Sequence, residues 1–151
     1  MNESDSERIA SSLEKKGYQA AQPETADLLI INVCSVRQSA IDRVYGLIRN
    51  YRKLKGKIIL TGCLLKTDHR KFEKIVDEIW PQPKLNIEPK CQKATSALLP
   101  IMTGCNNFCT YCAVPYTRGR EYSRPASEIK KDFKKLVKKG YQEITLLGQN
   151  V

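Results

Sequence analysis

Hydrophobic and polar positions along the first half of the chain predict helices and strands in turn. Residues 4–17 open with the capping-box pattern Ser-Asp-Ser-Glu and carry Ile9 and Leu13 on one face, which predicts a helix of about three turns. Residues 27–33 and 57–62 are continuous apolar runs of strand length, the kind that parallel sheets bury on both faces.

Helical spacing returns between these two strands and again after the second one. The residues at that spacing are Val36, Ala40, Val44, Leu47, Tyr51 and Leu54 between the strands, and Phe72, Ile75, Val76 and Ile79 after them. Helix, strand, helix, strand, helix is the order of a doubly wound α/β domain, which we therefore expect over residues 1–80.

The pattern breaks over residues 81–93, where prolines accumulate and no periodicity is left, so we expect a linker there. A second domain is expected over residues 94–151. Its pattern predicts a strand, a helix and a strand, at residues 97–102, 123–140 and 143–147. Pro100 limits the first of these strands to an edge or irregular pairing. The second domain is thus one βαβ unit.

Composition narrows the class of protein. The formal net charge of +10 attracts polyanions such as RNA. The alternative is that the charge only keeps the protein soluble. No apolar run approaches the roughly 20 residues that span a bilayer, and the first residues lack a signal peptide's basic start and apolar core. We therefore expect a cytoplasmic protein without a membrane partner. In that reducing compartment the six cysteines stay available for metal binding or catalysis.

Three cysteines, Cys105, Cys109 and Cys112, stand close together on a loop that leaves a predicted strand. Such a loop can wrap three thiolates around one iron-sulfur cluster, whereas structural zinc needs a fourth ligand that nothing nearby supplies. Three thiolates on a four-iron cluster leave one iron open, and that iron can chelate the amino and carboxylate groups of S-adenosylmethionine. The spacing predicts such a 4Fe-4S cluster; zinc and free thiols are the alternatives.

The stretch around this triplet, GCNNFCTYCAVPYTRGREYSRP at residues 104–125, resembles the signature of the radical S-adenosylmethionine methylthiotransferases that modify transfer RNA. Four further segments resemble the same family in the same order, at residues 2–10, 32–37, 61–63 and 146–151. The resemblance implies addition of a methylthio group to C2 of isopentenyl-adenosine beside the anticodon. Three alternatives remain open: a threonylcarbamoyl-adenosine substrate, a ribosomal-protein substrate, and a non-catalytic fragment that binds an iron-sulfur cluster or RNA.

The resemblance also implies a second 4Fe-4S cluster, with Cys34 and Cys63 among its ligands. Both residues follow predicted strands, so we expect them together at the carboxyl edge of the sheet, where open α/β folds bind ligands. A small buried cysteine is the alternative for each. The family's third ligand precedes the position of Met1, after a first strand that this chain lacks. The fold expected is therefore α/β: a doubly wound parallel-sheet domain without its first strand, then the first βαβ unit of a radical SAM barrel.

Two residues near the triplet are candidates for contact with the cofactor. The guanidinium of Arg118 can pair with a cofactor carboxylate or an RNA phosphate, and the ring of Tyr111 can pack on adenine or simply on the protein. We expect no ligand role for Cys91 or His69. The implied partners are transfer RNA, S-adenosylmethionine and an electron donor protein. We expect the protein itself to be a monomer. Since family segments are absent at both ends, we expect this chain to be inactive alone.

Overall fold

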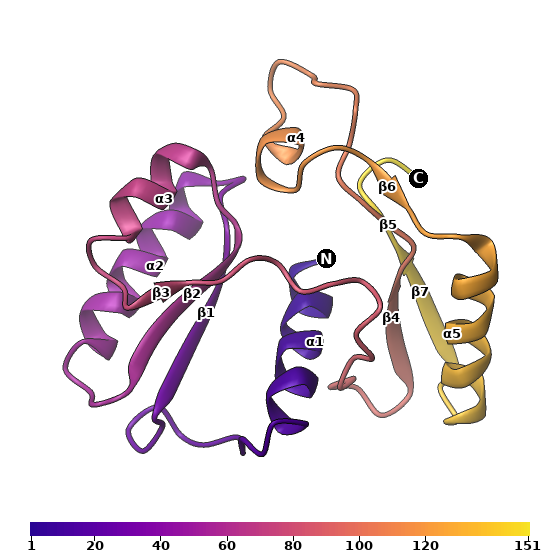
Figure 1. Ribbon diagram of the computed structural model, residues 1–151, viewed down its shortest axis with the longest axis horizontal. Helices are drawn as coiled ribbons and strands as arrows, with labels where there is room; N and C mark the ends of the chain where they lie inside the picture. Colours follow the sequence, from indigo (N-terminus) through magenta and orange to yellow (C-terminus); the bar gives the residue numbers. More distant parts are fainter.

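The computed structural model describes residues 1–151 as two α/β units joined by an irregular linker (Figure 1). The first unit contains α1 (Asn2–Glu14), β1 (Leu28–Cys34), α2 (Gln38–Tyr51), β2 (Lys57–Cys63), α3 (Lys66–Phe72) and β3 (Glu78–Ile79). The second unit contains β4 (Ser96–Pro100), β5 (Met102–Thr103), α4 (Val114–Thr117), β6 (Tyr122–Ser123), α5 (Ala126–Lys138) and β7 (Glu143–Leu147). None of these helices is both long and apolar enough to cross a membrane.

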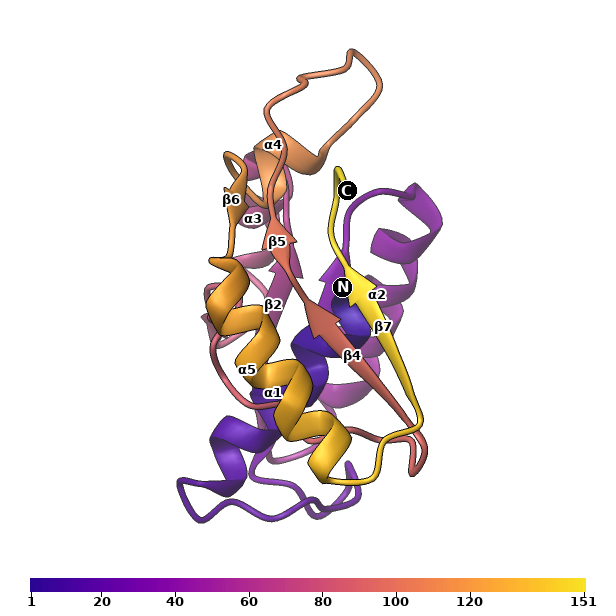
Figure 2. The same cartoon turned by 90° about the vertical axis from the view of Figure 1, so that its right-hand side faces the viewer.

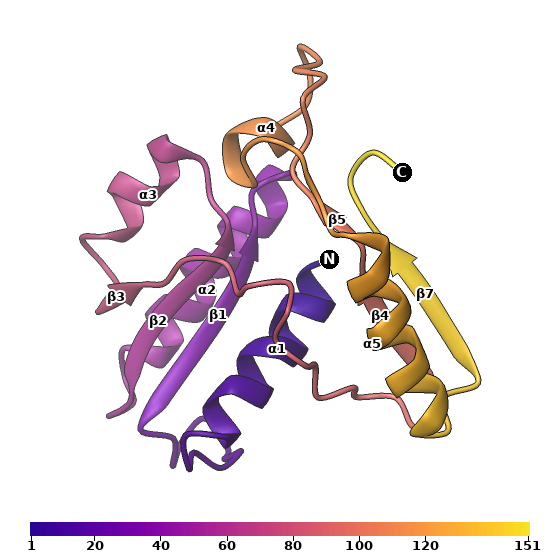
Figure 3. The same ribbon diagram turned by 45° about the vertical axis from the view of Figure 1, so that its right-hand side comes forward.

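The first unit is built on a parallel sheet in the order β1-β2-β3. Alternate residues of β1 face α2, and Leu29, Ile31 and Val33 are buried there against apolar side chains of α2 and α3. The opposite face of β1 meets α1, so helices cover both sides of the sheet (Figure 3). This arrangement explains the continuous apolar runs, because a strand covered on both faces has no side that prefers polar residues.

The second unit pairs β4 with β7 in parallel, and α5 forms the crossover between them (Figure 2). Leu136 of α5 is buried against Ala97 and Leu99 of β4. The expected α/β class, with a parallel-sheet domain followed by a βαβ unit, is confirmed.

Helix α1 lies between the two units, where it contacts both β1 and β4 (Figure 3). Its buried side chains are polar: Ser4, Asp5, Glu7, Arg8 and Ser11. Buried polar groups require hydrogen-bond partners, so this helix joins the two units by directed contacts rather than by apolar packing.

Sequence patterns placed some boundaries wrongly. The capping box is not formed, because α1 begins at Asn2 and places Ser4 and Glu7 inside the helix. The hydroxyl of Ser4 accepts a hydrogen bond from Arg8 instead, and the carboxylate of Glu7 accepts one from the backbone N–H of Gln92. These partners lie outside the four-residue pattern, which therefore cannot reveal them.

The helix after β2 is also shorter than expected, and Ile79 belongs to a third strand that the sequence did not suggest. The helix ends at Phe72, and Asp77, just before β3, accepts a hydrogen bond from the N–H of Ile58 at 2.7 Å and pairs with Arg52 at 2.8 Å. In the second unit the strand expected at 97–102 divides at Ile101 into β4 and β5, and β5 pairs antiparallel with β6.

We predict that Phe72→Ala destabilises the protein by about 3–5 kcal/mol, because Phe72 is fully buried and its ring stacks on Tyr45 with the centroids 4.7 Å apart. Urea unfolding measures the change. The matched control is Phe133→Ala on α5, where the ring is 43% exposed, and we expect a loss below about 1 kcal/mol. Equal losses for the two variants would contradict this account of the core.

Candidate metal centres

Cys34 and Cys63 end β1 and β2 and are direct register partners in the parallel pair. The residues that face α2 are the odd-numbered ones of β1, so both cysteines lie on the opposite face, toward α1. The expected placement at the carboxyl ends of adjacent strands is confirmed. Their role as metal ligands stays a prediction.

Asn2, at the start of α1, lies against this pair. Its Oδ1 is 3.6 Å from the Cys63 sulfur, and its Nδ2 donates a hydrogen bond to the carbonyl of Val33 at 2.8 Å. In return Asn32 donates to the Asn2 carbonyl at 2.7 Å. These bonds fix the first turn of the helix at the edge of the sheet that carries the cysteines.

The thiol of Cys63 is almost completely buried. Burial raises the pKa of Cys63, and the positive charge of Arg118 opposes part of that rise. A thiol in such a place stays protonated at neutral pH until a metal displaces the proton.

The cysteine triplet lies on the loop between β5 and α4. Cys105 is buried, and its N–H donates to the carbonyl of Gly119 at 3.2 Å. The N–H of Cys112 donates to the carbonyl of Cys109 at 3.0 Å, which closes a tight turn between those two residues. No three side chains of His, Cys, Asp or Glu converge on one point in the structure, so the cluster assignment stays a prediction.

Each of the two cysteine sites is preceded by a glycine in the left-handed region of backbone space. Gly62 has φ +106°, and a Cβ there would lie 2.3 Å from the carbonyl oxygen of Val33. Gly104 has φ +76°, and a Cβ there would lie 2.1 Å from the carbonyl oxygen of Arg120. Only glycine fits both positions, and each sets the direction in which the following cysteine leaves the strand.

Arg118 directly follows the short helix α4 and points inward. Its side chain is 4% exposed and pairs with Asp5 at 2.7 Å. It also donates to Oδ1 of Asn2 at 3.0 Å. The guanidinium is therefore engaged by the first unit in this structure, and contact with a cofactor stays a prediction.

Tyr111 differs from Arg118 in being 90% exposed, so its ring is not packed in the protein. The neighbouring Cys109 raises the pKa of the Tyr111 hydroxyl. The ring is thus accessible to a planar ligand beside the loop. That it binds adenine stays a prediction.

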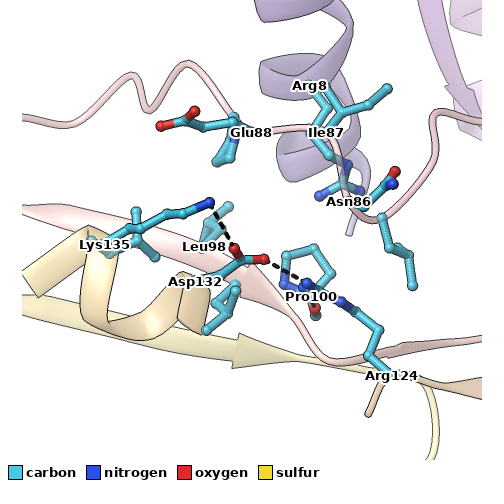
Figure 4. Close-up of a pocket in the computed structure, with 13 residues that line it drawn as sticks. Arg8, Asn86, Ile87, Glu88, Leu98, Pro100, Arg124, Asp132 and Lys135 are labelled. Carbon is cyan, nitrogen blue, oxygen red and sulfur yellow. Dashed lines mark hydrogen bonds and ion pairs between the residues drawn. The ribbon is translucent and has the colours of Figure 1, made fainter. Parts of the chain in front are cut away.

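Cys91 and His69 lie apart from these sites. Cys91 packs with Tyr141 against the small core of the second unit. His69 lies within α3, where Nδ1 is 3.1 Å from the carboxylate of Glu73. A small cavity between the linker, α1 and α5 encloses about 50 Å³, room for a few waters, and none of the cysteines lines it (Figure 4).

Comparison with known proteins identifies both units. Residues 1–80 match the Uncharacterized protein family UPF0004, and residues 99–151 match the Radical SAM superfamily. The chain belongs to the UPF0004 family. Its first unit is the UPF0004 unit, which carries Cys34 and Cys63, and its second is the radical SAM unit, which carries the triplet.

The relatives of the UPF0004 chain include curated enzymes named tRNA-2-methylthio-N(6)-dimethylallyladenosine synthase. The protein of Clostridium tetani is 39% identical, and those of Clostridioides difficile and Syntrophomonas wolfei are each 40% identical, all over the whole of this chain. The chain covers 42%, 40% and 42% of these three relatives, about two fifths of their length. The first alignment spans 191 positions against 151 residues here, so that relative also has positions inside the aligned span that this chain lacks.

The donor chemistry of the radical SAM unit fits an iron-sulfur cluster. Its three cysteines share one loop, one of them is held by a backbone hydrogen bond and the other two by a turn, and thiolates are the usual ligands of such clusters. In the UPF0004 unit the donors that fit are the paired Cys34 and Cys63.

Sequence reasoning missed the polar contacts of α1 with the radical SAM unit. The sequence placed Asn2 only in a family-like segment, and Asp5 only in that segment and in the capping-box pattern. The available signal was the spacing of Ser4, Asp5, Arg8 and Ser11 on one side of the helix, a polar stripe that the structure buries.

We predict that Gly104→Ala displaces the Arg120 carbonyl, weakens the Cys105 to Gly119 hydrogen bond and destabilises the protein by about 1–3 kcal/mol. Iron retained after anaerobic reconstitution should fall with it. The control is Gly46→Ala inside α2, where a Cβ meets nothing within 4 Å. That change should stabilise the helix by up to about 1 kcal/mol and leave the iron content unchanged. A fully stable, iron-replete Gly104→Ala protein would disprove the prediction.

Proposed function

We propose that the chain is part of a tRNA methylthiotransferase that acts on N6-dimethylallyladenosine, also called isopentenyl-adenosine. One observation carries the proposal: a single buried side chain, Arg118, connects the loop of the cysteine triplet to Asn2 beside Cys63. Methylthiolation needs two centres, one for radical formation and one for sulfur, that act on the same carbon. The names of the relatives at about 40% identity support this reaction and substrate.

In this proposal Cys105, Cys109 and Cys112 hold a 4Fe-4S cluster with one iron left for S-adenosylmethionine. When bound, that cluster supplies the electron for reductive cleavage of S-adenosylmethionine. The protein orients the loop through Gly104 and the hydrogen bond to Gly119. The exposed ring of Tyr111 is available to the adenine of the cofactor.

Cys34 and Cys63 are proposed to bind the second 4Fe-4S cluster. Their adjacent strand ends hold the two sulfurs on one face of the sheet. Asn2 closes that face on one side. The burial of Cys63 keeps water from the site, which favours chemistry that stray proton and hydrogen donors would interrupt.

RNA binding is proposed to follow from charge. The chain carries a net charge of +10, and a cleft of about 540 Å³ between the linker and the radical SAM unit is lined by the exposed cations Lys84 and Arg120. Arg118 and Arg124 also line it, but they are paired with Asp5 and Asp132. Exposed arginines and lysines attract phosphates strongly at low salt. An electron donor protein, a monomeric state and a cytoplasmic location complete the proposal.

We predict that a Cys34→Ala, Cys63→Ala protein still binds about four irons per chain after anaerobic reconstitution, because the triplet alone suffices to hold one cluster. The electron paramagnetic resonance spectrum of its reduced cluster should change when S-adenosylmethionine is added, since the open iron takes the cofactor as a ligand. The matched control is Cys105→Ala, Cys109→Ala, Cys112→Ala, which should lose that response.

Fewer than about two irons in the first protein, or zinc in their place, would overturn the cluster assignment. A four-iron cluster whose spectrum ignores S-adenosylmethionine would instead indicate an electron-transfer protein or a non-catalytic module.

A further inference from the structure

Four side chains bridge the two cysteine-bearing segments, and we refer to them as the bridging network: Asn2, Asp5, Gln82 and Arg118. They come from α1, the linker and the end of α4. Nothing in the proposed chemistry requires them to contact a cofactor or a substrate. Their contacts connect the UPF0004 unit, the linker and the radical SAM unit, and some anchor the network within the UPF0004 unit.

Arg118 makes the direct bridge. It is six residues after Cys112, and its N–H donates to the carbonyl of Val114, so the turn of α4 fixes its backbone. Its Nη2 is 2.7 Å from the carboxylate of Asp5 and 3.0 Å from Oδ1 of Asn2. The side chains of Arg118 and Asp5 are 4% and 2% exposed, so this ion pair is buried between the units.

Gln82, whose Oε1 accepts a hydrogen bond from Nη1 of Arg118 at 3.5 Å, makes a second bridge. Its Nε2 donates to the carbonyl of Gly62 at 3.1 Å and to the carbonyl of Thr117 at 2.9 Å. Gly62 directly precedes Cys63, and Thr117 directly precedes Arg118. One amide group therefore connects the strand end that carries Cys63 to the segment that leaves the triplet.

The other ends of the network are anchored in the UPF0004 unit. Asn2 contacts the Cys63 sulfur and the Val33 carbonyl, and Asp5 also pairs with the buried Arg8 at 2.6 Å. A displacement of Arg118 would thus be felt at the first turn of α1 and at the cysteine edge of the sheet.

Arg120 shows that proximity to the triplet does not by itself produce this arrangement. It is exposed, and its guanidinium lies over the ring of Phe108, 4.4 Å from the centroid. Two arginines separated by one glycine therefore differ in direction: Arg118 points into the interface, and Arg120 stays with its own loop.

We propose that Arg118 is a positioning residue that, with Asn2, Asp5 and Gln82, holds the Cys105–Cys112 loop at a fixed place relative to Cys34 and Cys63. The planar guanidinium suits this role, because one group reaches the carboxylate and the amide together, which an ammonium does less well. Contacts between α/β units of one chain allow relative motion unless specific interactions restrain it. The importance of Arg118 for catalysis rests on the proposed function. Its role in positioning the loop does not.

The test is hydrogen exchange measured by mass spectrometry on the purified chain, which needs no metal, cofactor or RNA. Arg118→Gln should raise exchange by about tenfold or more in two segments at once, residues 1–8 and residues 104–118, because removing one partner of a buried ion pair releases both sides. Asp5→Asn should raise exchange in the same two segments, although Asp5 belongs to a different unit from the loop. The centre of β2 should stay protected in both variants.

Two further variants keep the test decisive if Arg118→Gln unfolds. Arg118→Lys should give an intermediate rise, and Gln82→Ala, which strands no buried charge, should give a smaller rise near residues 62–63 and 116–118. Arg120→Gln is the matched control and should leave residues 1–8 unchanged. A rise confined to the loop in the Arg118 and Gln82 variants would overturn the proposal. If coupling is found but the reconstituted cluster ignores S-adenosylmethionine, the positioning stands and the proposed function falls.

Discussion

The buried carboxylate of Asp5 is the interaction on which the arrangement of the two units depends. It faces Arg8 and Arg118, both almost fully buried, and neither cation has another acid of comparable burial within ion-pair distance. Burial lowers the pKa of Arg8, and Asp5 opposes that fall. Burial is also the largest effect on Arg118, but the charge and hydrogen bond of Asp5, together with Cys63, outweigh it, so the pKa of Arg118 is raised. Without Asp5, two positive charges would stand unpaired in the interface, a large cost.

This constraint reaches the triplet along a short stretch of chain and reaches Cys63 through the contact of Asn2. Asp5 is in the helix that begins beside Cys63, and Arg118 follows the helix that begins after Cys112. Parallel pairing then places Cys34 opposite Cys63. The register of the sheet brings the thiols of Cys34 and Cys63 together, and local turns hold the three thiols of the triplet on one loop. The contacts of Arg118 with Asp5 and Asn2 then position the triplet relative to the other two thiols.

The sequence predicts what depends on local pattern. Apolar runs gave β1 and β2, helical spacing gave α2, and β7 was placed at its observed bounds, because burial imposes a period on the residues themselves. The start of α1, the end of α3 and the short pair of β5 and β6 were missed. Two of these depend on partners distant in sequence: Val33 and Asn32 for Asn2 at the start of α1, and the chain after the triplet for β5.

Arg118 shows the same limit within the candidate site. In the sequence an arginine beside a cysteine triplet reads as a ligand for an anionic cofactor, and Arg120 two residues later has the same chemistry. What separates them is a carboxylate 113 residues away, which turns Arg118 inward while Arg120 remains exposed over Phe108. The local sequence shows that this loop carries an arginine. Only the fold decides whether it meets a ligand or the other half of the protein, and here it meets Asp5 at 2.7 Å.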